Sequence, residues 1–322
     1  MSPWLGAGVS LAAPAEPAGW RRVFALAERA DALGLHSVWL PENHFTRAAT
    51  PSPLVALGAL AARTRRLRLA TTSLLLPLHH PLRVAAETAT VDALSGGRLW
   101  LGLGRGFREP VFAGFEVESA TKRDRFDEAL DVLLAAWSGE EVALAGVHFS
   151  AREGARVRLG LRPCQRPHPP LVVAAFGPKG LRQAARRGLA YLASPLETLA
   201  ALEENYALWR ETAAGATAPG PQAPVMRTLF VARDDAEANA VREALAAEAR
   251  SLATGVSPAL ARKASGPLPE RVLVGMPNEV RDGLARYRER LGMDLLVARI
   301  EVPGVPPAAR DASLERFAEL AA

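Results

Sequence analysis

Long apolar runs, cysteines and lysines are all scarce in this sequence of 322 residues. Its apolar runs, such as residues 67–78, are interrupted by polar residues, glycine or proline well short of the ~20 residues that a membrane-spanning helix needs. Cys164 is the only cysteine, so no internal disulfide can form. The first residues, MSPW, lack the basic start and apolar core of a secretory signal. We therefore expect a cytoplasmic protein without a membrane partner.

Positive charge is modest and dispersed. The formal net charge is +5, and because only three residues are lysines, nearly all of the basic charge comes from arginine. A nucleic-acid-binding protein gathers its basic side chains into one stripe. Here the arginines are spread along the chain and interleaved with acidic residues. We therefore expect no nucleic-acid partner.

Several common catalytic motifs are also missing. The sequence has no Gly-x-Ser-x-Gly elbow, no phosphate loop ending in Gly-Lys-Ser/Thr and no His-Glu-x-x-His helix. No two of the six histidines are four residues apart, so we predict no metal site. Cys164 lies in a proline-bracketed loop, where a nucleophilic thiol is not expected. A hydrolase or aldolase would need a reactive lysine or a metal cluster, and the sequence suggests neither.

What the sequence does contain is an alternation of short apolar runs with amphipathic stretches, which is typical of parallel β/α units. Eight runs qualify as strands, at 5–11, 37–40, 67–72, 99–103, 171–174, 190–193, 225–231 and 295–300. The helices between them include 18–33, 55–63, 82–94, 123–137, 179–187, 196–212 and 236–252. This pattern predicts an α/β fold, specifically a single (β/α)8 TIM barrel domain over residues 1–322.

The chain is longer than the roughly 250 residues that are usual for such a barrel. We assign the surplus to two insertions. The first, at about 139–170, is typical of a hairpin with a proline-rich return, and the second, at about 254–277, is rich in glycine, proline and serine. An open doubly wound sheet is the alternative fold, but it needs a glycine-rich turn after the first strand, and residues 11–14 (LAAP) do not supply one.

The helix expected over 123–137 has recognisable ends. Thr121 followed by Asp124 matches a capping box, and Gly139 supplies a stop. Between these ends, large apolar side chains recur at helical spacing on one face, at Phe126, Leu130, Leu133, Leu134 and Trp137. We predict that this face packs against the barrel and does not bind a ligand.

The strand at 99–103 ends in alternating glycines with one arginine among them, Gly104-Arg105-Gly106, followed by Phe107. Bare backbone beside a guanidinium would suit an anionic ligand. Glycine in a barrel strand can also do no more than relieve crowding, so both interpretations stay open. The spacing is not that of a dinucleotide-binding loop.

Two further strands end in polar residues. The strand at 67–72 leads to Ser73, and the strand at 37–40 leads to Glu42, Asn43 and His44. Barrel enzymes place their sites at the carboxyl ends of the strands. These side chains, together with Arg105, therefore form a candidate site.

Three segments carry a family resemblance. Residues 37–45 (SVWLPENHF), 74–81 (LLLPLHHP) and 95–106 (SGGRLWLGLGRG) resemble the bacterial luciferase-like family of flavin-dependent monooxygenases. Residues 163–170 and the strand from Gly292, before Pro303-Gly304, are similar to the family as well, so the resemblance covers nearly the whole chain. Within the family, the segment at 104–106 is more similar to the branch that uses FMN than to the branch that uses a deazaflavin.

The resemblance implies a β/α barrel that binds reduced FMN at its C-terminal mouth and uses it with O2 to oxidise a small organic substrate. It also implies that a separate flavin reductase can supply the reduced FMN. Carried over by position, Ser73 falls at a bulge beneath the flavin ring, Arg105 and Gly106 fall at the phosphate clamp, and Phe107 falls beside the ring. The resemblance further implies a cis peptide bond between Thr72 and Ser73.

The remaining implied phosphate contacts are Ser194 and Thr198, which follow the strand at 190–193 and open a helix. A helix N-terminus suits an anion on physical grounds as well. We therefore expect Arg105 to reach the phosphate alongside these two hydroxyls. The family commonly forms dimers through helices near its second to fourth strands, so the resemblance implies a homodimer, for which residues 55–60 offer an apolar face.

One position departs from the family pattern. The luciferases have paired histidines after the glutamate, and the first acts in catalysis, whereas this sequence has Asn43 there and keeps His44. Asparagine cannot exchange a proton near neutral pH, so acid/base work would pass to His44, to Glu42 or to the flavin peroxide itself. The leading hypothesis is an FMN-dependent monooxygenase. The alternatives are a catalytically silent flavin-binding homologue and a deazaflavin-dependent dehydrogenase of the same superfamily.

Overall fold

The computed structural model describes residues 4–12, 16–46, 50–152, 155–175, 177–213, 215, 220–253 and 266–321. The chain divides into two compact units. Unit 1 comprises residues 1–11, 29–39 and 175–322, and unit 2 comprises residues 12–28 and 40–174. The helix α1 (Pro17–Ala32) and the strand β2 (Ser37–Leu40) each have residues in both units. The single domain predicted from the sequence stays a prediction.

The strands of unit 2 are parallel and buried. β3 (Arg68–Thr71) pairs with β5 (Leu99–Gly104), and β5 pairs in turn with β8 (Leu171–Ala174) and with the short β4 (Leu74–Leu75). All six residues of β5 are buried. A run of apolar residues without polar alternation is expected of a parallel strand that is covered on both faces.

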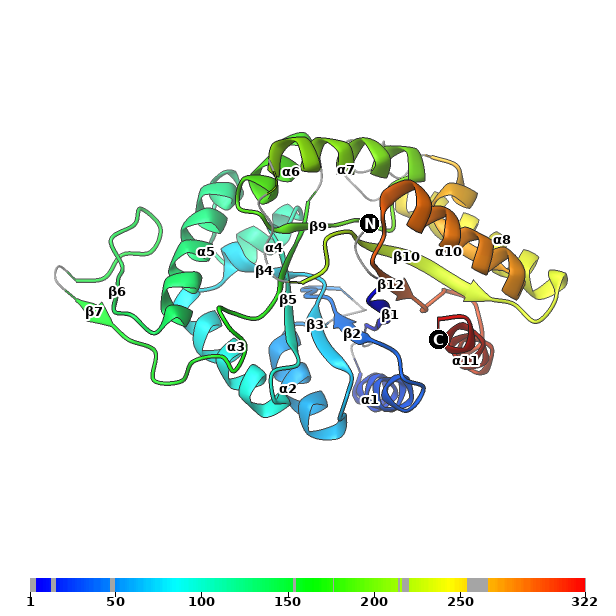
Figure 1. The fold of residues 1–322 in the computed structure, drawn as a ribbon, viewed down its shortest axis with the longest axis horizontal. Helices are drawn as coiled ribbons and strands as arrows, with labels where there is room; N and C mark the ends of the chain where they lie inside the picture. Colours follow the sequence, from blue (N-terminus) through cyan, green and yellow to red (C-terminus); the bar gives the residue numbers. More distant parts are fainter. Residues whose placement is uncertain are drawn as a thin grey trace. The chain divides into compact units, whose positions relative to one another are not determined.

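Helices cover these strands within unit 2. α2 (Pro53–Arg63), α3 (Pro81–Ser95) and α5 (Lys122–Ser138) follow one another alongside β3 and β5 (Figure 1). A shorter helix, α4 (Glu109–Gly114), follows β5. α3 and α5 both end at glycines in the left-handed conformation, Gly96 with φ 64° and Gly139 with φ 85°. Glycine adopts this conformation without the steric penalty of a Cβ, so the predicted stop at Gly139 is confirmed.

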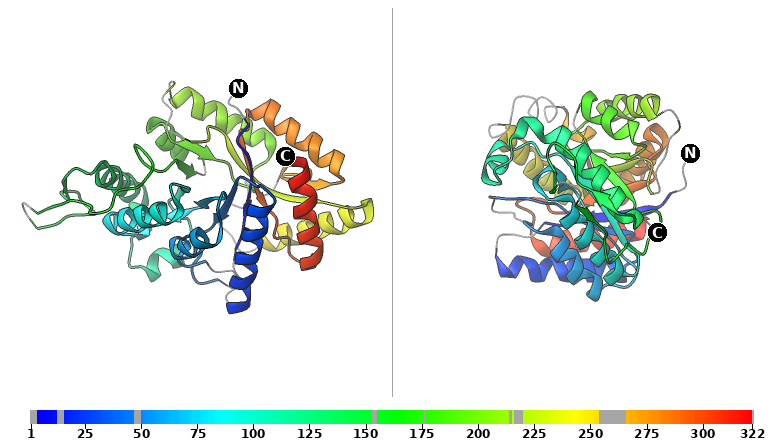
Figure 2. Two further views of the ribbon diagram at one scale, coloured as in Figure 1. Left: turned by 60° about the horizontal axis from the view of Figure 1, so that its bottom comes forward. Right: turned by 90° about the vertical axis from the view of Figure 1, so that its left-hand side faces the viewer.

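The first predicted insertion contains the expected hairpin. β6 (Val142–Ala143) pairs in antiparallel fashion with β7 (Arg156–Val157), with Val142 opposite Val157. The hairpin extends away from α5 in both Figure 1 and Figure 2. The return from the hairpin is fixed to α3, because the backbone N–H and the side-chain amide of Gln165 both donate hydrogen bonds to the buried carboxylate of Asp92.

Unit 1 is also built on parallel strands. β1 (Gly6–Ser10) pairs with β2 on one side and with β12 (Leu295–Arg299) on the other. The long strand β10 (Pro224–Val231) pairs with β12 through its first half and with β11 (Val272–Gly275) through its second half. β9 (Ala190–Leu192) leads to Ala193, which forms a bridge with Val225 at the start of β10.

The helices of unit 1 are α6 (Pro178–Arg186), α7 (Leu199–Ala213), α8 (Asp235–Ala253), α10 (Pro277–Leu291) and α11 (Pro307–Ala321). One face of α8 packs Ala238, Val241 and Leu245 against Phe230 of β10. Their spacing of three and four residues is that of one helical face. None of the helices within the described residues combines the length and the apolarity that crossing a bilayer requires.

The structure confirms all eight predicted strands, with ends that differ by at most one residue. The predicted capping box is wrong. The Thr121 hydroxyl donates to the carbonyl of Glu118 at 2.8 Å in a 3-10 turn over Ser119–Thr121, and it does not cap α5. The helix predicted from Leu196 begins at Leu199, because residues 194–197 form a turn. Of the second predicted insertion, 254–265 lie outside the described residues, and the remainder contains β11, which the sequence pattern did not predict.

Candidate active site

A buried carboxylate lies just beyond the end of β2 in unit 2. Glu42 is only 4% exposed, and its Oε1 atom lies 2.7 Å from His44 Nε2 and 2.8 Å from His79 Nε2. Its Oε2 atom accepts a hydrogen bond of 2.6 Å from the backbone N–H of Leu75. Since an ionised carboxylate can only accept hydrogen bonds, three donors converge on it. The structure thus brings the predicted site residues Glu42 and His44 into contact and adds His79 to them.

The hydrogen bonds decide the charge of this cluster. Burial raises the pKa of the Glu42 carboxyl, but hydrogen bonds from His44, His79 and Leu75 and the charge of His79 more than offset it, so the pKa is lowered from 4.5 to about 2. Burial lowers the pKa of His79, yet the hydrogen bond and the charge of Glu42 raise it above 6.5. Glu42 is therefore an anion at neutral pH, and it favours the imidazolium form of His79.

Aromatic rings and an arginine fix His44 from its other sides. Its ring meets that of Phe115 edge to face, with the centroids 4.7 Å apart. Arg108 donates a hydrogen bond of 3.1 Å from Nη1 to the backbone carbonyl of His44. His44 is 8% exposed, so this ring has one defined orientation beside Glu42.

Ser73 lies against bare backbone at the end of β5. The peptide bond between Thr72 and Ser73 is cis, as the sequence resemblance implied. The backbone N–H of Glu42 donates to the Ser73 carbonyl at 3.4 Å. A Cβ placed on Gly104 would lie 2.1 Å from Ser73 Oγ, so only glycine fits there.

A small pocket of about 70 Å³ opens beside these groups. Five predicted site residues line it, namely Glu42, Asn43, His44, Gly106 and Phe107. The rest of the wall is formed by Leu75, Arg108, Val111 and Phe112. Phe107 is 57% exposed, so its ring presents an aromatic surface at the pocket's edge. The lining combines apolar walls with a few polar groups, which is typical of a small-molecule site.

Arg105, between the two glycines, is 9% exposed and lies over the ring of Phe126 at 5.7 Å. Burial and the neighbouring charge of Arg123 lower the pKa of Arg105 to about 10, while Asp127 acts in the opposite direction. The side chain remains a cation at neutral pH. A partly buried guanidinium of this kind suits an anionic ligand.

The other predicted phosphate contacts lie in unit 1, in the turn between β9 and α7. Thr198 is the N-cap of α7, because its Oγ1 atom accepts a hydrogen bond of 3.2 Å from the backbone N–H of Ala201. Ser194 Oγ likewise accepts a bond of 3.2 Å from the backbone N–H of Leu196. Each hydroxyl accepts from the backbone and keeps its own O–H as a donor.

Two buried side chains that the sequence analysis did not single out hold this turn. Glu197 accepts hydrogen bonds from the Tyr191 hydroxyl at 2.5 Å and the Asn205 amide at 2.9 Å. Arg227, on β10, is fully buried and donates to the carbonyls of Ser194 at 2.7 Å and Glu197 at 3.0 Å. These hydrogen bonds hold the turn between β9 and α7 in place.

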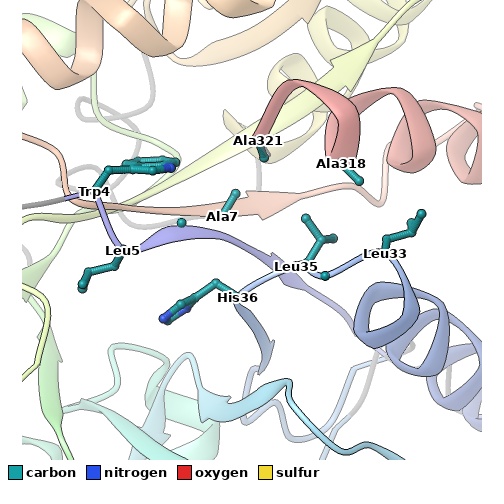
Figure 3. A pocket seen from close by; sticks show the side chains of 10 residues that line it. Trp4, Leu5, Ala7, Leu33, Leu35, His36, Ala318 and Ala321 are labelled. Atoms are coloured by element: carbon teal, nitrogen blue, oxygen red, sulfur yellow. The ribbon is translucent and has the colours of Figure 1, made fainter.

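A second cavity, of about 320 Å³, belongs to unit 1 and lies at the amino ends of β1 and β2 (Figure 3). Leu33, Leu35, Ala318 and Ala321 supply most of its apolar wall. His36 is its one ionisable side chain, and its Nδ1 atom pairs with Ser37 Oγ at 3.1 Å. Because parallel β/α folds place their sites at the carboxyl ends of strands, we do not assign the active site here.

Comparison with known proteins identifies the family. The model of the luciferase-like monooxygenase family matches residues 3–294. The chain belongs to this family. Among curated proteins, this luciferase-like chain is 35% identical over 175 residues to 4-hydroxyprotoasukamycin monooxygenase of Streptomyces nodosus subsp. asukaensis, a match that covers 54% of the chain and 46% of that protein.

It is also 31% identical over 178 residues to the oxygenase component of flavin-dependent trigonelline monooxygenase of Acinetobacter baylyi, covering 53% of the chain and 47% of that protein. The matches therefore span about half the length of these curated relatives. The relatives in the family that are named for their activity support a flavin-dependent enzyme.

A solved structure extends the likeness to the whole fold. The monooxygenase RslO1 of Streptomyces bottropensis is 30% identical, with a TM-score of 0.83 and 98% of each chain covered. The luciferase-like chain thus has the α/β fold of its family.

The sequence analysis found most of the unit 2 cluster and missed His79. His79 belongs to a segment that was recognised as family-like, residues 74–81, but it was given no role. The sequence did offer a signal, because His79 follows the predicted strand end at Ser73 by only six residues. Among the described residues, no group of three or more His, Cys, Asp or Glu side chains could hold a metal ion.

Proposed function

We propose that this chain is an FMN-dependent monooxygenase that takes reduced FMN and O2 and oxidises a small organic substrate. The observation that carries the proposal is the buried charge of Glu42, which holds His44 and His79 beside a pocket walled by the backbone of Gly106 and the ring of Phe107. The relatives named as flavin-dependent monooxygenases support this assignment. The closed barrel predicted from the sequence is the scaffold that we propose for it.

The residues present fit reduced FMN. Apolar and aromatic side chains at Leu75, Phe107 and Phe112 suit a flat ring system, and the Ser73–Gly104 contact leaves backbone bare beside it. In unit 2, the cationic side chain of Arg105 is suited to the phosphate. The Ser194 and Thr198 hydroxyls of unit 1 keep O–H donors and stay predicted phosphate contacts. When bound, reduced FMN supplies the two electrons that activate O2.

The protein's own residues would position the substrate and move a proton. Because Glu42 is an anion, His44 donates to it through Nε2, which leaves Nδ1 as the acceptor of the imidazole. The Nδ1 atom of His44 is then the atom that can take a proton from a substrate in the pocket. The Asn43 side chain lines the same pocket and can donate a hydrogen bond without exchanging a proton.

The test is a binding experiment followed by an isotope experiment. Reduced FMN, titrated without oxygen, is expected to bind, and riboflavin is expected to bind more weakly. Oxygen labelled with 18O is then admitted with a panel of small phenols, ketones and aromatic acids, and label in a product is read by mass spectrometry. Absence of flavin binding contradicts the proposal outright. Binding without any labelled product favours the silent homologue, which the replacement of the family histidine by Asn43 motivates.

A deazaflavin-dependent dehydrogenase is the second candidate. The chain is 34% identical over 183 residues to the F420-dependent glucose-6-phosphate dehydrogenase of Beutenbergia cavernae, which covers 55% of the chain and 53% of that enzyme. Titration with F420 under the same conditions separates the two candidates. Tighter binding of F420 than of FMN would replace the monooxygenase with a dehydrogenase.

A separate reductase and a second copy of the chain are the proposed partners. The trigonelline enzyme is named as an oxygenase component, which supports a reductase as the source of reduced FMN. On α2 and α3, the side chains of Val55 and Leu94 are 73% and 62% exposed, and apolar side chains of this size suit a dimer interface. Light scattering is expected to give twice the chain mass, and a Val55→Glu variant should give the monomer mass.

A further inference from the structure

A small pocket in unit 1 lies next to the turn between β9 and α7. It measures about 40 Å³, and Leu196 of the turn and Leu268 of the 3-10 turn Leu268–Glu270 form part of its apolar wall. Its polar lining residues are Thr228, Glu248, Arg271 and Arg299. One water needs roughly 10–15 Å³ of such space, so this pocket can take a group with the size of a phosphate, a sulfonate or a carboxylate.

The charges around the pocket do not cancel. Arg299 donates through Nη2 to both carboxylate oxygens of Glu248, at 2.8 and 2.6 Å, so that pair is neutral. Arg271 is 6% exposed, and within the described residues no partner hydrogen-bonds its buried Nε. Burial and the charge of Arg227 both lower the pKa of Arg271. Within the part of the chain that the structure describes, this buried guanidinium therefore keeps an N–H without an acceptor.

Arg227 shows that this fold can satisfy a buried arginine. Its Nε donates to the Tyr287 hydroxyl at 2.7 Å, and its two terminal nitrogens donate to the backbone carbonyls of the β9–α7 turn. Buried polar groups are almost always hydrogen-bonded, because leaving one unpaired is costly. Arg271 lies close enough to Arg227 for that charge to lower its pKa, but its Nε has no acceptor within the described residues. This contrast indicates that the missing partner of Arg271 is an anion.

The segment that carries Arg271 is held close to the turn. A Cβ on Gly266 would lie 2.1 Å from Thr198 Cγ2, so Gly266 packs directly on the N-cap of α7. The Tyr287 hydroxyl donates to the carbonyl of Glu270 at 2.9 Å, which fixes the residue before Arg271. These two contacts hold the backbone that leads into Arg271, and a backbone held in this way helps to preorganise a binding group.

We propose that this pocket binds an oxyanion, with Arg271 as the cationic ligand and the Thr228 hydroxyl as a second donor. A guanidinium presents two parallel N–H groups that match two oxygens of a phosphate, sulfonate or carboxylate. This inference rests on the proposed function, within which the oxyanion is either the phosphate of FMN or an acidic group of the substrate.

The first test uses inorganic phosphate and sulfate on the purified chain. Phosphate is expected to raise the unfolding temperature of the wild type in a saturable way, and Arg271→Met should abolish that rise. Without phosphate, Arg271→Met should unfold no earlier than the wild type, because it removes a buried unpaired charge. The matched control is Arg281→Met, an exposed arginine on α10 that bonds Asn278, and it should keep the phosphate response.

A wild type that ignores both anions overturns the proposal, and so does an Arg271→Met variant that responds as the wild type does. The source of the anion follows from flavin affinities. A loss of about tenfold or more for FMN with riboflavin unchanged assigns the pocket to the flavin phosphate, since one charge-assisted pair is worth that much. If Arg271→Met abolishes only the phosphate response and leaves both flavins unaffected, the pocket takes the acidic group of a substrate. A wild type that responds to phosphate but binds no flavin contradicts the proposed function and leaves the pocket standing.

Discussion

Glu42 and Glu197 occupy comparable places in the two units. Each lies just beyond the carboxyl end of a parallel strand, and they are 4% and 1% exposed. Glu42 accepts hydrogen bonds from two imidazoles and a backbone N–H. Glu197 accepts them from a phenol, an amide and the backbone N–H of Ser194. Burial and donor number are alike, and the chemistry of the donors differs.

The chemistry of the donors distinguishes the candidate site around Glu42 from the structural cluster around Glu197. The pKa of His79 is raised above 6.5, so its bond to Glu42 responds to protonation in the range where an enzyme works. Burial and the charge of Glu197 raise the pKa of Tyr191 well above 10.0, and an amide does not titrate at all. The Glu197 cluster therefore keeps one arrangement over the working pH range, which suits the structural role of holding the β9–α7 turn.

The largest expected effect is on Glu42. Glu42→Gln replaces the carboxylate with a neutral amide, and the NH2 group of that amide faces N–H donors. One of His44, His79 and the Leu75 amide then has no acceptor. Breaking a buried pair by removing one partner costs several kcal/mol, so we expect a loss of about 3 kcal/mol in the free energy of unfolding by urea at pH 6. The control is Glu203→Gln, whose partner Arg290 is exposed, and it should cost far less than Glu42→Gln. Equal losses for the two variants would mean that burial of Glu42 has no energetic weight.

Arg105 tests whether unit 2 binds the flavin phosphate. Arg105→Ala should weaken FMN binding on the order of tenfold to a hundredfold, because a charge-assisted hydrogen bond contributes about 1.5–3 kcal/mol. Riboflavin, which lacks the phosphate, should bind the variant and the wild type alike. Equal losses for both flavins would show that Arg105 is structural, acting through its contacts with Phe126 and its neighbours on α5. Isothermal titration with each flavin measures both affinities.

The two clusters also differ in how far the sequence reveals them. Glu42, Asn43 and His44 are adjacent in the chain and follow a strand whose pattern is plain, so their shared position could be predicted. His79 is 37 residues from Glu42, and only the fold brings their side chains together. The pattern of short parallel strands was equally readable, because several strand ends, such as those before Glu42, Ser73 and Arg105, are marked by the change from apolar to polar residues.

The network in unit 1 could not be predicted in the same way. Arg227 is a charged residue inside a run of eight buried strand residues, where propensity gives no hint of its partners. Its partners belong to the turn after β9 and to α10, which are far away in the sequence. The false capping box at Thr121 has a related cause, since a 3-10 turn took the hydroxyl that the pattern assigned to the helix.

Glu197 is expected to show a smaller effect than Glu42. Glu197→Gln places an amide donor against one of the donors from Tyr191, Asn205 or Ser194. An unsatisfied buried group of this kind costs about 1–2 kcal/mol in the free energy of unfolding. Because none of these partners titrates near neutral pH, the loss should be the same at pH 6 and pH 8. A loss that changes between those two values would break the distinction between scaffold and site.

The smallest expected effect is the pH dependence that His79 gives to stability. Its pKa is raised above 6.5 in the folded chain, so its contribution is complete below pH 6.5 and is lost as the pH rises through the raised value. The pKa of Glu42 is lowered from 4.5 to about 2, so its contribution is complete above pH 4.5 and is lost as the pH falls toward 2. The pair therefore stabilises the fold most between pH 4.5 and 6.5.

His79→Gln keeps an N–H that can reach Glu42 but does not titrate. It should cost roughly 0.5–1.5 kcal/mol at pH 6, where the charge-assisted bond is lost, and almost nothing at about pH 9, where the wild-type imidazole is neutral as well. Urea unfolding at a series of pH values measures this difference, and His148→Gln in the hairpin insertion serves as the control. If wild type and His79→Gln gave parallel profiles from about pH 5 to 9, the charge of His79 would not be coupled to Glu42, and the contrast with Glu197 would then rest on hydrogen-bond geometry alone.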